Sequence, residues 1–355
     1  MARLIAIAAV LLACTRDVSA YSVLAHEANV DALWDSHIRR LLVQRFPRTS
    51  RDDLLHARAY AYGGSVMQDL GYYPFGNHFF SNLVHYVRSG DFVTTLIRDA
   101  RDVNEYAFAL GALAHYTADN TGHPEAVNRA VPIEYPKLRR KFGDRVTYVQ
   151  SPTRHVIVEF SFDVVQAAAG AYVPYAYHAF IGFEVAKPLL ERAFRQTYGL
   201  DMKDVFGDED LAIATYRYSV SQLLPELTRT AVKTNKDLVV YRYTRVQFEK
   251  EFGTGYRRPG FFARFIAFVY RIVPKIGPLS TLSFKAPTAE SEALFTASFR
   301  DASARYARAL DQVRGGRLAL ANANLDIGRV ARRGEYSLAD KTADELRQRL
   351  ERARH

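Results

Sequence analysis

Apolar residues recur at intervals of three and four positions along most of this chain, which is the spacing that places them on one face of a helix. Runs that alternate as strands do are few, and residues 237–243 form the only candidate. The sequence therefore predicts an all-α protein. Helices are expected at residues 22–46, from 50 to a break at Gly63 and Gly64, and at 104–118, 153–169, 173–198, 208–232, 289–313 and 337–354.

Two of these expected helices are especially informative. Residues 104–118 are rich in alanine and almost entirely apolar, which indicates burial on most sides. Gly122 and Pro124 should end this helix, so that His123 lies at its C-terminal edge or on the following turn. Ser151 and Pro152 supply an N-cap and a first-turn proline for the helix at 153–169.

The first twenty residues have the features of an export signal: Arg3 precedes an apolar stretch at 4–13, and small residues occupy 18–20. Cleavage there would leave Tyr21 at the N-terminus of a secreted or periplasmic protein. The alternative is lipoprotein processing at Cys14, which fits a loose lipobox less well. We therefore expect a signal peptide at 1–20, followed by a catalytic domain at 21–245 and a C-terminal extension at 246–355.

Composition narrows the chemistry of the mature chain. Cys14 is the only cysteine, so metal ligands must come from His, Asp, Glu or backbone groups, and no disulfide is available. The formal charge of +10, which becomes +9 once residues 1–20 are removed, favours anionic partners such as phospholipid headgroups, nucleic acid or acidic glycans. Beyond the signal, no stretch reaches the length of apolar sequence that a membrane-spanning helix needs.

The C-terminal extension contains a segment of unusual composition at residues 257–275. Aromatic and bulky apolar residues alternate there with arginine and lysine, and proline and glycine lie at both ends. This composition is typical of a segment that lies in a membrane interface and contacts anionic lipid. A core helix with a cationic outer edge explains the pattern equally well, because apolar spacing alone does not separate the two.

Candidate chemistry is concentrated in two pairs of residues. His115 and Asp119 are four positions apart, as are His155 and Glu159, so each pair projects from one face of its helix. His123 follows Asp119 by another four positions. Paired imidazole and carboxylate groups at this spacing indicate a metal site.

Three further residues complete the candidate set, namely His26, Asp69 and His85. An ion such as zinc takes three or four protein ligands, so eight side chains exceed what one ion needs. Two or more metal ions are expected. Imidazole and carboxylate ligands without thiolate suit Zn, Mn or Fe.

In their order along the chain, these motifs resemble the zinc-dependent phospholipase C family, which shares its fold with the S1/P1 nucleases. The resemblance covers roughly residues 21–230 and implies up to three zinc ions in a mostly helical domain. It also implies a water molecule activated by zinc as the nucleophile, with Asp69 orienting it or acting as its general base. The implied ligands are Asp69, His85, His115 and Asp119 for one ion, His123, His155 and Glu159 for a second, and the amine and carbonyl of Tyr21 with His26 and Asp119 for a third.

The chain departs from the family pattern in three places. The family commonly begins with Trp where this chain has Tyr21, although a ligand formed by backbone atoms does not depend on the side chain. His123 lies closer to Asp119 than is usual for the first ligand of the second ion. The residues after about 245 have no counterpart in the compact members of the family.

The resemblance implies a phosphodiester hydrolase, with phospholipase C acting on membrane phospholipids as the first hypothesis. Its partners would be the phospholipid substrate and a membrane surface contacted by residues 257–275, with no dedicated nucleic-acid partner. A nuclease of the S1/P1 type is the alternative within the same chemistry. A membrane-associating protein that keeps the fold without catalysis is the alternative outside it.

Overall fold

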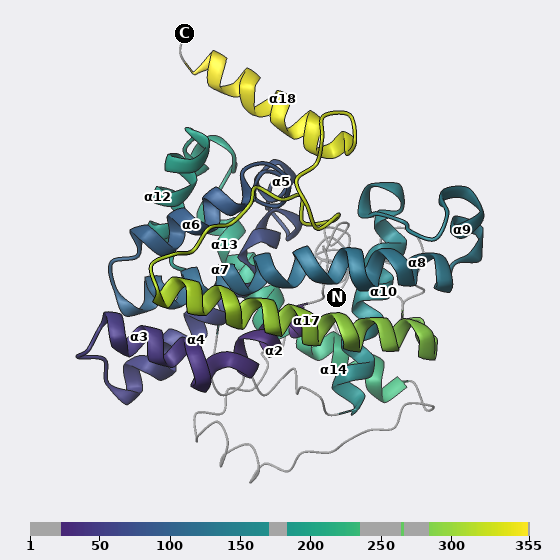
Figure 1. The fold of residues 1–355 in the computed structure, drawn as a ribbon, viewed down its shortest axis with the longest axis horizontal. Coiled ribbons are helices and arrows are strands. Elements are labelled where there is room, and N and C mark those ends of the chain that lie inside the picture. The colour runs from purple at the N-terminus through teal and green to yellow at the C-terminus, as the bar shows by residue number, and fades with distance from the viewer. Residues whose placement is uncertain (1–22, 170–182, 235–263, 266–283, 354–355) are drawn as a thin grey trace.

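A computed structural model describes residues 23–169, 183–234, 264–265 and 284–353 (Figure 1). Throughout this part of the chain the regular elements are helices, and β-pairing is limited to an isolated bridge between Asn324 and Arg329. The predicted all-α class is confirmed. Within the same residues, no helix combines the length and the apolar character needed to cross a bilayer.

The helices follow one another with short connections. The longer ones are α2 (Val23–Leu33), α4 (Arg51–Val66), α5 (His78–Tyr86), α6 (Ser89–Asp99), α7 (Val103–Gly122), α10 (Pro152–Ala169), α12 (Lys187–Tyr198), α13 (Glu209–Tyr218), α14 (Leu224–Thr234), α17 (Ala289–Arg314) and α18 (Ser337–Arg352). The shorter ones are η1 (Trp34–Ile38), α3 (Arg39–Arg45), η2 (Met67–Tyr72), η3 (His123–Val127), α8 (Asn128–Glu134), α9 (Pro136–Phe142), η4 (Tyr148–Gln150), η5 (Met202–Asp204) and η6 (Ser219–Leu223).

Helix α7 is the central element of the molecule. It is almost completely buried, as its apolar sequence predicts, and it packs most extensively against α4 and α17. Figure 1 shows α17 running alongside α7 across the middle of the molecule. Asp102 caps the start of α7 by accepting hydrogen bonds from the backbone N–H groups of Asn104 and Glu105. Side chains on α7 are therefore held in a closed, rigid interior.

Glycines let α4 approach α7 more closely than any other residue would. A Cβ atom added to Gly64 would lie 1.9 Å from the backbone oxygen of Phe108, and one added to Gly111 would lie 2.1 Å from that of Ala61. The predicted break at Gly63 and Gly64 is wrong, because α4 continues through both residues to Val66. Close packing of two backbones outweighs the low helix propensity of glycine here.

The region after α7 also differs from the prediction. The helix ends at Gly122, but the chain continues through the π-helical turn η3 and into α8, so Pro124 does not interrupt the helical course. Pro124 occupies the second position of η3, so the residue without a backbone N–H lies where the helix widens into a π-helical turn. The helix expected over 153–169 is present as α10, whereas residues 183–186 precede α12 without helical structure.

A segment without helical structure connects α17 to α18 and crosses the ends of several other helices (Figure 1). We call residues 321–328 the crossing segment. Ala323 and Leu325 are buried in the main core. The crossing segment therefore packs into the same hydrophobic core as α7.

Several expectations lie outside the described residues. These are the export signal at 1–20 with Cys14, the N-terminal residue Tyr21, the strand candidate at 237–243, the domain boundary at 245 and nearly all of the basic aromatic segment at 257–275. They remain predictions.

We expect Gly64→Ala to lower the free energy of unfolding by at least about 2 kcal/mol, because the added methyl group must separate α4 from α7. Chemical denaturation monitored by circular dichroism measures the change. Gly207→Ala is the matched control, since a Cβ there meets no atom within 4 Å. Equal stability of the two variants would contradict this account of the packing.

Candidate metal centre

Seven segments of the chain bring their polar side chains to one buried place. Helix α7 supplies His115 and Asp119, and because the helical course continues through Gly122, His123 follows Asp119 by one further turn on the same face. The other side chains come from separate elements: His26 from α2, Asp69 from η2, His85 from α5, His155 and Glu159 from α10, and Asp326 from the crossing segment.

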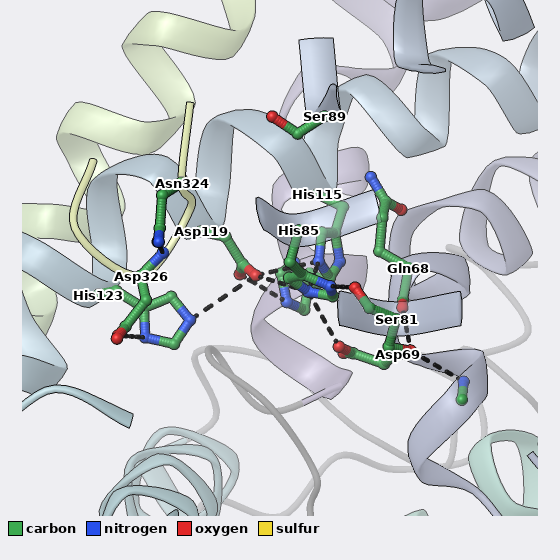
Figure 2. A network of polar contacts seen from close by, with 12 residues as sticks. Gln68, Asp69, Ser81, His85, Ser89, His115, Asp119, His123, Asn324 and Asp326 are labelled. Atoms are coloured by element: carbon green, nitrogen blue, oxygen red, sulfur yellow. Dashed lines mark hydrogen bonds and ion pairs between the residues drawn. The ribbon is translucent and has the colours of Figure 1, made fainter. Parts of the chain in front are cut away.

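Asp119 lies at the middle of this assembly, between His85 and His115 on one side and His123 on the other (Figure 2). Its side chain is fully buried. Imidazole nitrogens approach its two carboxylate oxygens from four residues, at 3.3 Å for His26, 3.4 Å for His85, 3.0 Å for His115 and 3.7 Å for His123. One carboxylate thus faces four potential metal ligands.

Hydrogen bonds to backbone carbonyls determine how His85 and His115 are oriented. Nδ1 of His85 lies 2.7 Å from the oxygen of Ser81, and Nδ1 of His115 lies 3.0 Å from the oxygen of Ser65. A carbonyl oxygen only accepts, so both Nδ1 atoms donate, and the neutral rings present lone pairs at Nε2. The two Nε2 atoms are 3.2 Å apart. Two nitrogens that face each other at this distance need positive charge between them, either a proton on one of the rings or a metal ion.

The separations fit a metal ion. Zinc binds nitrogen and oxygen at about 2.0–2.2 Å, so neighbouring ligands of a tetrahedral ion lie about 3.3–3.5 Å apart. Nε2 of His85 lies 3.3 Å from Oδ1 of Asp69 and 3.4 Å from Oδ2 of Asp119. Oδ1 of Asp69 and both oxygens of Asp119 are buried and accept no hydrogen bond. We call Asp69, His85, His115 and Asp119 the first group.

His26 joins the first group from α2. Its ring stacks on that of His115 with centroids 4.3 Å apart, and ligand atoms of His26, Asp69 and His115 lie within 4.8 Å of one another. Ligand atoms of His85, His115 and Asp119 also lie within 4.8 Å of one another. Every one of these side chains is at most 2% exposed, so water does not screen their charges. The donor set suits a divalent cation with nitrogen and oxygen ligands.

Charges in the first group stabilise one another. Burial lowers the pKa of His85, but the carboxylates of Asp119 and Asp69 outweigh burial and raise this pKa to about 10. Burial raises the pKa of Asp119, yet the imidazoles of His115, His85 and His26 hold it well below its usual range. The arrangement requires positive charge between these carboxylates, whether a proton or a metal ion supplies it.

A second group lies on the other side of Asp119 and consists of His123, His155 and Asp326. Their ligand atoms lie within 4.8 Å of one another, and all three side chains are buried. Oδ1 of Asp326 is 3.3 Å from Nδ1 of His123 and 3.8 Å from Nε2 of His155. The two imidazole rings stack with centroids 5.0 Å apart. This geometry provides three converging ligands for a further cation.

Glu159 contacts the second group only through His155. Its Oε1 lies 2.7 Å from Nδ1 of His155, as the four-residue spacing on α10 predicts. Nε2 of His155 lies 2.7 Å from Oδ1 of Asn128. Burial raises the pKa of Glu159 well above its usual range and lowers that of His155 to about 4. In the structure Glu159 therefore has the position of an orienting partner to His155.

The structure brings together most of the residues proposed from the sequence. Asp69, His85, His115 and Asp119 converge with His26, and His123 meets His155, whereas Tyr21 is outside the described residues. The assignment of individual ligands to individual ions remains a prediction. Sequence reasoning missed Asp326, because it stands in a non-helical segment with no ligand-type residue at helical spacing that would single it out.

Fold and site together define a class: helical proteins with a buried cluster of imidazoles and carboxylates that could hold metal ions. Residues 33–208 match the family model described as zinc dependent phospholipase C. This part of the chain carries the domain of that family, which confirms the resemblance inferred from the order of the motifs. The family is one of zinc-dependent hydrolases. Searches of curated proteins and of solved structures returned no match.

We expect Asp119→Asn to reduce the zinc bound per chain and to weaken the remaining zinc by at least about tenfold, because ligands of both groups face this carboxylate. Elemental analysis after dialysis against a weak chelator measures the loss. Asp52→Asn, in the exposed first turn of α4, is the control and should keep the zinc of the unaltered protein. Unchanged zinc in Asp119→Asn would contradict the proposed centre.

Proposed function

We propose that this protein is a zinc-dependent phosphodiester hydrolase that acts as a phospholipase C on membrane phospholipids. The observation that carries the proposal is the convergence of two buried ligand groups on the shared carboxylate Asp119. The family match over residues 33–208 supports the same chemistry. Centres with several neighbouring metal ions are suited to phosphoryl transfer, in which both the attacking and the leaving oxygen carry charge.

Zinc bound in such a centre lowers the pKa of a bound water molecule and polarises a phosphoryl oxygen. The protein's own residues would orient the reactants. We assign Asp69 the task of holding the attacking water and accepting its proton, because Oδ1 of Asp69 is buried, accepts no hydrogen bond and faces the metal ligand His85. His85 and His115 are fixed by Ser81 and Ser65, so the ligands need little rearrangement.

The family match and the charge of the chain support a phospholipid as the substrate. A phospholipid presents an anionic phosphodiester, and the formal charge of +10 favours such a partner. We propose that residues 257–275 contact the membrane surface, as their mixture of aromatic and basic residues suggests. The same metal chemistry would serve a nuclease, so the choice between lipid and nucleic acid depends on the assay below.

Purified protein loaded with zinc should hydrolyse phosphatidylcholine vesicles to diacylglycerol and phosphocholine, and it should leave single-stranded DNA intact. A strong chelator should abolish turnover and added zinc should restore it. Asp69→Asn should lower kcat by about 10²–10⁴ through loss of proton transfer, whereas Asp52→Asn should not. Cleavage of DNA without cleavage of lipid would instead make the protein a nuclease. If the purified protein binds lipid but contains no zinc and turns over neither substrate, it is not an enzyme of this kind.

We further propose that residues 1–20 are removed on export and that the new α-amino group of Tyr21 binds a third ion together with His26 and Asp119. The start of α2 supports this, because Val23, Leu24 and His26 are at most 1% exposed. The N–H of Leu24 also donates to Asp163, which anchors the start of the helix. The N-terminus of the mature chain would thus begin beside the first group.

Protein recovered from an exporting host should have the mass of a chain that begins at Tyr21. Two residues added ahead of Tyr21 should lower the bound zinc by one ion, because the α-amino nitrogen becomes an amide and loses its lone pair. Mass spectrometry and elemental analysis measure both effects. A lipidated chain that begins at Cys14 would exclude this third site and leave the other two groups unaffected.

A further inference from the structure

The crossing segment is held against the metal centre by hydrogen bonds from several directions. The groups that bind it belong to α5, α6, α7 and α8. The hydroxyls of Tyr116 and Ser89 donate to the backbone oxygens of Ala321 and Ala323, at 2.7 and 2.6 Å. The N–H of Asp91 donates to the side chain of Asn322 at 2.9 Å, and the side-chain amide of Asn128 donates to the backbone oxygen of Asp326 at 2.7 Å. The backbone oxygen of His85 accepts from the N–H of Leu325 at 3.1 Å.

These contacts connect the crossing segment directly to the metal ligands. Leu325 binds the backbone of His85 itself, and Asn128 contacts both Asp326 and His155. Gly328 has a positive φ of 73° and packs against Pro124, so the chain turns away from the centre immediately after Asp326. The position of Asp326 is therefore determined by the surrounding helices.

The two carboxylate oxygens of Asp326 have different surroundings. Oδ2 accepts hydrogen bonds from the N–H of Tyr148 at 3.1 Å and from the hydroxyl of Tyr336 at 2.8 Å. Oδ1 is buried, accepts no hydrogen bond and faces His123 and His155. A carboxylate with one oxygen fixed by donors and the other directed at imidazoles has the arrangement of an oriented metal ligand.

Glu159 is in a different position. It faces Nδ1 of His155, while Asp326 lies on the Nε2 side of the same ring. The amide nitrogen of Asn128 donates to the backbone oxygen of Asp326, so the amide oxygen of Asn128 is the atom that faces Nε2 of His155. Nε2 therefore carries a proton and donates it to this amide oxygen. For Nε2 to bind a cation, the ring proton must reside on Nδ1 instead, from where it is donated to Glu159. A carboxylate that accepts a hydrogen bond from the second ring nitrogen of a metal-binding histidine orients the ring.

We propose that Asp326 is the carboxylate ligand of the second group and that Glu159 orients His155 instead of binding the ion. This inference rests on the zinc-dependent function proposed above. Asp326 lies outside residues 33–208, the part of the chain that matches the family. The C-terminal extension of this protein thus supplies a residue of its metal centre, and the domain that binds metal does not end with the family match.

The first test compares zinc binding by Asp326→Asn, Glu159→Gln and the control Asp311→Asn, which alters an exposed carboxylate near the end of α17. A chromophoric chelator in competition with the full-length protein reports the affinity for each ion. Loss of an orienting partner costs about 10–100-fold in affinity. We expect that range for Glu159→Gln, a larger loss confined to one ion for Asp326→Asn, and no change for Asp311→Asn.

The second test produces a new signal instead of a loss. Asp326→Cys in a Cys14→Ser background places the only thiol of the chain at the proposed ligand position. Loading with Co²⁺ should then give the sulfur-to-cobalt charge-transfer absorption of a bound thiolate, which Asp311→Cys should lack. Circular dichroism of each variant without metal confirms that it is folded.

The outcomes separate this inference from the proposed function. If Asp326→Asn retains every zinc ion with unchanged affinity and Asp326→Cys gives no charge-transfer band, Asp326 is not a ligand, although the enzyme assignment stands. A loss on Glu159→Gln that exceeds the loss on Asp326→Asn would reverse the two roles. If the unaltered protein binds no zinc, both the inference and the proposed function fail.

Discussion

The structure depends on a concentration of charge that an apolar interior does not tolerate without a cation. Asp119 and Asp69 are buried, and the Nε2 atoms of His85 and His115 face each other 3.2 Å apart. Burial of ionised carboxylates costs several kcal/mol each unless an opposite charge accompanies them. The rigid packing of α7 against α4, through Gly64 and Gly111, keeps these groups from moving apart. The packing of the fold thus holds the residues of the candidate metal centre together.

Helical periodicity explains why much of the first group could be predicted from the sequence. His115 and Asp119 are four residues apart on a helix, so local geometry alone places them together. That Asp69 and His85 meet them did not follow from local geometry and came from the order of the motifs. The apolar composition of α7 likewise predicted its burial, because a helix without a polar face must be covered on all sides.

The errors and omissions share a physical cause, which is long-range packing. Gly63 and Gly64 were expected to break a helix, but they are the residues that allow α4 to touch α7. Asp326 follows α17 in a non-helical segment, and its position depends on hydrogen bonds to four helices that come earlier in the sequence. Neither the hydrophobic periodicity nor the spacing of polar residues in the sequence predicts such long-range contacts. The four-residue spacing of His155 and Glu159 correctly indicated their contact, but it does not tell which nitrogen of the ring Glu159 faces.

Anomalous X-ray diffraction at the zinc absorption edge, from crystals of the zinc-loaded protein, tests the central claim most directly. The account predicts one peak among Asp69, His85, His115 and Asp119 and another among His123, His155 and Asp326. Zinc found only at the surface, or side chains of both groups that remain in place without any metal peak between them, would contradict it.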